Sequence, residues 1–215
     1  PAGVDGHLVL EAVRFLQRSN IVIEPRRRWP QPGGLPRYHL NGNIRPEVRP
    51  EIGRALSIWG DSGWGARVRN GKYQERFFAE DLIHACMSML EEWDPQPVSG
   101  WVTSIASDRY PDLVPSFAKR LAKELDLPYV STLACSQSSG ERSAMANSVQ
   151  RARTLDGSMD IDPSSVLEGP VLLVDDLVDT RWTMSIASWL LRSNGSGPVY
   201  PLALAYMGWR TDQSN

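Results

Sequence analysis

The chain has 215 residues, of which 41% are hydrophobic and 22% charged, a composition typical of a globular protein rather than a fibrous or disordered one. Its longest apolar stretches are far shorter than the roughly 20 residues that span a bilayer, and it opens without a signal peptide, so we expect no membrane contact and a cytoplasmic location. The two cysteines and three histidines stand apart without ligand spacing, which indicates neither a disulfide framework nor a metal site.

The net charge of −2 conceals an asymmetry between the two parts of the chain. Residues 1–80 hold 13 Lys+Arg and 8 Asp+Glu, whereas residues 81–215 hold 10 and 17. An anionic partner such as nucleic acid would therefore meet the N-terminal part more readily, although a merely solvated basic surface explains the asymmetry equally well. The chain opens at Pro1 without an initiator Met, so we expect a piece of a longer protein.

The N-terminal part predicts a helix, a strand, a long loop and a second helix. Apolar residues at helical spacing indicate a helix near residues 8–16, and the run Ile21–Ile23 indicates a strand. A connection crowded with Pro, Gly and Asn covers residues 26–43, and a helix is expected at about 46–59. We assign residues 1–75 to a basic accessory segment and residues 76–215 to a larger domain.

The larger domain alternates helices and strands. Apolar stripes predict helices at 78–93, 113–125 and 183–192, and short apolar runs predict strands at 101–105, 129–130, 171–174 and 199–205. Strands that alternate with helices indicate an α/β fold with a parallel sheet flanked by helices.

Two acids follow the most apolar of these strands. Val171–Val174 is continuously apolar, as a strand covered on both faces should be, and Asp175 and Asp176 come directly after it. Open α/β sheets bind ligands at the carboxyl ends of their strands, where such acids can accept hydrogen bonds from sugar hydroxyls or hold Mg²⁺. The turn at residues 179–183 leads into a helix whose free N–H groups suit a phosphate. The alternative is that both acids only cap the next turn.

The run VLLVDDLVDTRWT, residues 171–183, resembles the signature of type I phosphoribosyltransferases: four apolar residues, two acids, a spacer and Thr-Gly-x-Thr. In that family the acids contact ribose hydroxyls and the loop holds the 5′-phosphate. The resemblance implies a type I phosphoribosyltransferase-like sheet, with the ribose at Asp175 and Asp176 and the phosphate at Asp179, Thr180, Arg181, Trp182 and Thr183.

Two further segments resemble parts of the same family. Ser107, Asp108 and Arg109 are similar to its pyrophosphate-binding loop, and residues 137–159 are similar to its mobile flap. The resemblance implies a phosphate-containing small molecule as a partner, with Mg²⁺ accompanying a phosphorylated ribose as the cofactor. It assigns no catalytic residue here.

One position departs from the signature. Arg181 replaces the loop glycine, and the bulky Trp182 follows it. Glycine serves where backbone amides must approach a phosphate closely or where φ is positive. The Arg181 guanidinium could bind an anion or block the pocket, so the transferase reaction stays open.

Over nearly its full length the chain is similar to the C-terminal region of actinobacterial RecQ-like DNA helicases, which act in DNA repair. The strings that carry this resemblance are EPRRRWP (Glu24–Pro30), GRAL (Gly53–Leu56) and GDSGWG (Gly60–Gly65). The chain contains no GxxxxGK[ST] loop; the nearest string, GARVRNGKY at Gly65–Tyr73, has the wrong spacing.

The helicase resemblance implies an accessory domain without transferase activity of its own. Its partner would be DNA, reached through the upstream motor and through a basic cluster with a stacking ring, Arg26, Arg27, Arg28 and Trp29. Two other functions stay open: an active phosphoribosyltransferase or a domain that senses phosphoribosyl pyrophosphate or a nucleotide, and a purely structural interaction module.

Overall fold

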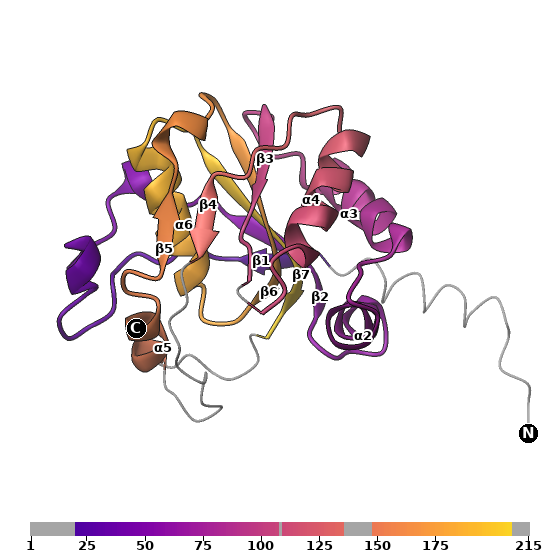
Figure 1. Cartoon of the computed structure of the whole chain (residues 1–215), viewed down its shortest axis with the longest axis horizontal. Coiled ribbons are helices and arrows are strands. Elements are labelled where there is room, and N and C mark those ends of the chain that lie inside the picture. The colour runs from indigo at the N-terminus through magenta and orange to yellow at the C-terminus, as the bar shows by residue number, and fades with distance from the viewer. Residues whose placement is uncertain (1–19, 108, 136–147, 208–215) are drawn as a thin grey trace, which may run out of the picture.

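A five-stranded, mainly parallel sheet forms the centre of the molecule (Figure 1). A computed structural model describes residues 20–107, 109–135 and 148–207. The strand order is β1-β2-β7-β6-β3, in which only β1 is antiparallel to its neighbour. The strands are β1 (Ile21–Ile23), β2 (Gly53–Ile58), β3 (Trp101–Ser104), β6 (Val171–Val178) and β7 (Val199–Tyr206). The predicted α/β fold, a parallel sheet flanked by helices, is confirmed.

Regular helices cover one face of the sheet. They are α2 (Trp64–Asn70), α3 (Glu80–Trp93) and α4 (Leu113–Glu124), close to the ranges that the apolar stripes predict for the last two. Leu172 and Val174 of β6 pack in this core, where the rings of Phe78 and Phe117 meet edge to face with centroids 5.8 Å apart. One turn of π-helix, η3 (Gly71–Glu75), continues α2.

The opposite face is covered by one long helix and by irregular chain. The helix is α6 (Trp182–Ser193), and beside it lie α5 (Ser148–Thr154) and the two-stranded sheet of β4 (Leu133–Cys135) and β5 (Met159–Ile161). Val171 and Leu173 of β6 pack into this core. Because side chains alternate along a strand, the two faces of β6 belong to two different cores.

The Pro- and Gly-rich connection also packs against this second face. Trp29, Leu35 and Ile44 are each at most 3% exposed in the core beside α6. Short 3₁₀ turns, η1 (Pro36–Tyr38) and η2 (Pro46–Val48), interrupt the connection, and Tyr38 Oη exchanges hydrogen bonds of 2.7 and 2.8 Å with the backbone of Met159. The long connection is therefore part of the core and not a peripheral loop.

The prediction of a helix at residues 46–59 is wrong. Residues 53–58 form strand β2, which pairs with β7 in parallel, and only η2 is helical in the predicted range. A Cβ atom at Gly53 would lie 2.5 Å from the Pro201 carbonyl oxygen, so close sheet packing determines this segment rather than its helical propensity.

One sheet contains strands from both sides of residue 75: β1 and β2 come before it, and β3, β6 and β7 come after it. The sheet therefore does not divide at residue 75, and the proposed division into residues 1–75 and 76–215 stays a prediction. The helix expected near residues 8–16 lies outside the described residues. Among the described residues, no helix is both long and apolar enough to cross a lipid bilayer.

Candidate functional site

Four parallel strands end at one edge of the sheet, which α2 and α5 flank at the lower right and lower left of Figure 1. Asp175 and Asp176 lie on β6 near this edge and are 8% and 5% exposed. Asp175 Oδ1 accepts a 2.8 Å hydrogen bond from the Asp176 amide, and the strand continues to Val178 rather than ending before the acids.

Lys72 reaches Asp176 from a distant part of the sequence. Its ammonium lies 2.9 Å from Oδ1 and 2.8 Å from Oδ2 of Asp176, and the two side chains are 15% and 6% exposed. The sequence prediction missed this residue. It stands in GARVRNGKY, a string that fails as a nucleotide-binding loop, and no pattern signals its contact with β6.

The turn from β6 to α6 has a backbone shape that usually requires glycine. Arg181, the residue at the glycine position, is in the left-handed region with φ 67° and ψ 2°, and α6 begins at Trp182. A non-glycine residue there costs about 1–2 kcal/mol. The first turn of a helix leaves N–H groups without intrahelical acceptors, so the N–H groups of Trp182 and Thr183 lie beside this bend.

Arg26 binds this turn from the N-terminal part of the chain. Its Nε donates to the Thr180 carbonyl at 2.7 Å, and its guanidinium carbon lies 3.8 Å from the ring centre of Trp182. Ser148 Oγ accepts hydrogen bonds from Arg26 at 2.9 Å and from Trp182 Nε1 at 3.0 Å. The bulky Trp182 is therefore packed away at 3% exposure and held by Arg26 and α5.

Two more arginines surround the turn. Arg181 Nη1 donates to the Glu24 carbonyl at 3.2 Å, and this hydrogen bond holds the Arg181 side chain against the segment after β1. Arg151 of α5 forms an ion pair with Asp179. The structure thus brings together three arginines that lie far apart in sequence, at the residues that the signature assigns to phosphate.

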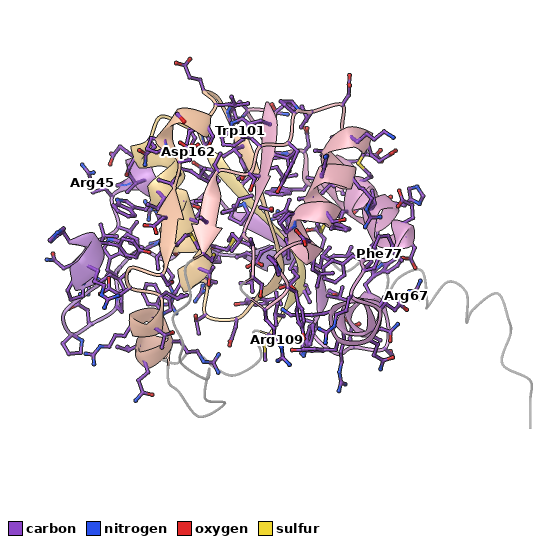
Figure 2. All side chains as sticks on the ribbon, in the orientation of Figure 1. Arg45, Arg67, Phe77, Trp101, Arg109 and Asp162 are labelled. Atoms are coloured by element: carbon purple, nitrogen blue, oxygen red, sulfur yellow. The ribbon has the colours of Figure 1, made fainter. Side chains whose placement is uncertain are left out.

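The second predicted loop lies at the same edge. The Ile105 amide donates to the Val174 carbonyl at 3.0 Å, and the Ser107 carbonyl accepts from Tyr110 at 3.1 Å. Figure 2 shows Arg109 at the opposite end of β3 from Trp101, on the site's side of the molecule. Arg109 is exposed, and Asp108 lies outside the described residues.

The predicted nucleic-acid cluster divides into two pairs. Arg26 contacts the turn and Trp29 is 3% exposed in the core, so neither side chain is presented to solvent as a flexible arm. Arg27 and Arg28 are exposed, and Arg28 Nε donates to Asn43 Oδ1 at 3.1 Å.

The residues at this edge do not make a complete magnesium site. Mg²⁺ prefers six oxygen ligands in near-ideal octahedral geometry. No group of three or more His, Cys, Asp or Glu residues that could hold a metal ion together occurs among the described residues, and both carboxylate oxygens of Asp176 are in contact with Lys72.

Neither a protein-family model nor a curated protein matches the chain. Solved structures similar to it include adenine phosphoribosyltransferase from Saccharomyces cerevisiae, with 14% identity over 92% of this chain and 89% of that one, at a TM-score of 0.44. The enzyme of the same name from Leishmania tarentolae has 15% identity over 60% and 72%, at 0.39, and orotate phosphoribosyltransferase from Aeropyrum pernix 21% over 94% and 81%, at 0.34. Scores below 0.5 at these identities carry no argument about function.

Proposed function

We propose that the chain binds a ribose phosphate at the carboxyl edge of its sheet and holds it without transferring it. The observation that carries this proposal is the left-handed backbone of Arg181. A strained conformation of a non-glycine residue persists where the surrounding structure enforces it, and such residues concentrate at binding sites. The bend retains the shape in which backbone N–H groups can approach a phosphate, although the glycine has been replaced.

The charges around the turn favour an anion. Four cations, Arg26, Lys72, Arg151 and Arg181, accompany three carboxylates, Asp175, Asp176 and Asp179. The N-terminal end of α6 adds its partial positive charge. A phosphate dianion at this edge would therefore meet an excess of positive charge, while the two acids of β6 remain suited to ribose hydroxyls.

Turnover asks for more than binding. A transferase must hold phosphate, ribose, metal and pyrophosphate together with the reacting atoms aligned. Lys72 contacts both oxygens of Asp176, so this carboxylate is not free to hold the metal. These observations support a domain that senses or stores a ribose phosphate over an active phosphoribosyltransferase.

Calorimetry with ribose 5-phosphate tests the proposal. Thr183→Val removes one hydroxyl from the first turn of α6, and we expect about a 10- to 100-fold loss of affinity because a hydrogen bond to a charged group is removed. Ser193→Ala removes an exposed hydroxyl at the other end of the same helix and should change nothing. Equal affinities for wild type and Thr183→Val would place the phosphate elsewhere.

Arg181→Gly separates an open pocket from a blocked one. Since Arg181 is one of the four cations at this edge, we expect the glycine variant to bind ribose 5-phosphate about 10-fold more weakly than wild type, but still measurably. Binding seen only in the glycine variant would mean that Arg181 closes the pocket. Conversion of a nucleobase by wild type with phosphoribosyl pyrophosphate and Mg²⁺ would establish the transferase instead.

A role as an accessory domain of a RecQ-like DNA helicase is our second proposal. It depends on the sequence resemblance, and the exposure of Arg27 and Arg28 supports a weak contact with DNA phosphates. A ribose-phosphate site and such a role are compatible, because the two arginines belong to a different segment from the turn after β6.

A further inference from the structure

We infer that Lys72 is the built-in cation of this site, so that a ribose phosphate monoester binds there without a divalent metal. This inference rests on the proposed function and specifies its ligand. A phosphate monoester needs less compensating charge than a pyrophosphorylated sugar, and Lys72, Arg26 and Arg151 supply fixed positive charge at this edge.

The contact between Lys72 and Asp176 has the geometry of an occupied cation position. The ammonium contacts both carboxylate oxygens, at 2.9 and 2.8 Å, where a metal ion would need at least one of them. An ammonium has three N–H donors. One is donated to Oδ1 of Asp176, whereas Oδ2, 2.8 Å away, accepts no hydrogen bond from the described residues, so the other N–H groups can serve a ligand oxygen.

The backbone around Lys72 is held in place. The Lys72 carbonyl accepts a 2.8 Å hydrogen bond from Arg76, and the Gly71 carbonyl accepts one of 3.1 Å from the Phe77 amide. A Cβ atom at Gly71 would lie 2.7 Å from the Phe77 carbonyl oxygen, so this position requires glycine. Single π-helical turns of this kind are frequent at functional sites.

Burial of the pair makes replacement by a metal unfavourable. Both side chains are at most 15% exposed, and separating a buried pair leaves a charge without its partner. Mg²⁺ also gives up its water ligands reluctantly. A pair that served packing alone would affect stability but not the metal dependence of ligand binding, and this difference can be measured.

The test compares ribose 5-phosphate binding in EDTA and in Mg²⁺. We expect wild type to bind equally well, within about 2-fold, in both buffers. Lys72→Met should lose about 10-fold in EDTA, the loss of one charged hydrogen bond, and regain part of it with Mg²⁺. Lys119→Met, an exposed lysine on α4, is the matched control. Wild-type binding that requires Mg²⁺ would overturn the inference.

Bound Mn²⁺, detected by its paramagnetic resonance without any sugar, separates this inference from the proposed function. Wild type should bind none at this edge, and Lys72→Met should gain a weak site that Asp176→Asn abolishes. If ribose 5-phosphate binds under neither condition, the proposed function fails, whereas Mn²⁺ bound by wild type and lost in Asp176→Asn overturns the role of Lys72. Should Lys72→Met not fold, Lys72→Arg keeps the charge and must still bind ribose 5-phosphate in EDTA.

Discussion

The two faces of the central sheet are covered in different ways. Helices α3 and α4 form a regular layer on one face, whereas α6 shares the other with the irregular residues 26–48. Both layers bury large aromatic side chains, since Trp29 on the irregular side is 3% exposed and Phe117 on the regular side is fully buried. A segment without regular structure can therefore be core, and here it also carries Arg26 to the site.

The largest expected effect tests whether the irregular layer is as stabilising as the regular one. Trp29→Ala should lower the free energy of unfolding by about 3–5 kcal/mol, as should Phe117→Ala, because each leaves a large cavity. Denaturation in urea measures both, with the exposed Arg28→Ala as the control. A loss below about 1 kcal/mol for Trp29→Ala would show that residues 26–48 are only loosely attached.

A smaller effect concerns the contact between the irregular residues 26–48 and β5. Tyr38→Phe removes the hydroxyl that pairs with both backbone groups of Met159, and we expect a loss of about 1–2 kcal/mol. Thermal melts of the variant and of wild type at neutral pH measure it. An unchanged melting temperature would mean that water replaces the hydroxyl without cost.

The same tyrosine makes the contact between residues 26–48 and β5 sensitive to alkaline pH. Burial raises the pKa of Tyr38 above its ordinary value of 10.0. Between pH 10 and the folded-state pKa, Tyr38 is still protonated in the folded protein, whereas the unfolded chain has released the proton. The contribution of Tyr38 to the free energy of unfolding is therefore fully present below pH 10 and is lost as pH rises through the folded-state pKa. Stability measured from pH 8 upward should fall less steeply above pH 10 in Tyr38→Phe than in wild type.

The smallest effect separates the two pairs within the basic cluster. Replacing both Arg27 and Arg28 by Ala should weaken binding to single-stranded DNA and reduce its salt slope by about 2, because two phosphate contacts are removed. Arg26→Ala should leave that slope unchanged, since Arg26 is bonded to Thr180 and Ser148. Fluorescence anisotropy across a salt series measures both, and the reverse result would assign DNA binding to the turn.

The same contrast between the faces explains what the sequence could predict. The stripes of α3 and α4 repeat every three to four residues, so these helices were predictable, as was the apolar core of β6. The segment 53–58 was wrongly predicted as a helix, because its strand conformation depends on pairing with β7, about 150 residues away. Periodicity reports local structure, whereas the irregular layer is specified by contacts between distant residues.

The candidate site divides in the same way. The acids and the turn at 179–183 lie in one continuous run, which a resemblance can identify. Lys72, Arg26 and Ser148 reach that run from separate parts of the chain, at separations of 104, 154 and 34 residues from their partners on it. Their contacts with it follow from the fold alone, because no spacing rule joins a lysine on a π-helical turn to an acid on β6.

Amide chemical shifts on addition of ribose 5-phosphate test the central claim most directly. If the turn after β6 holds the phosphate, the largest shifts should occur at the N–H groups of Thr180, Trp182 and Thr183, with Arg28 and Asn43 unchanged. Shifts confined to Arg28 and Asn43, or none at saturating ligand, would contradict a ribose-phosphate site at the carboxyl edge of the sheet.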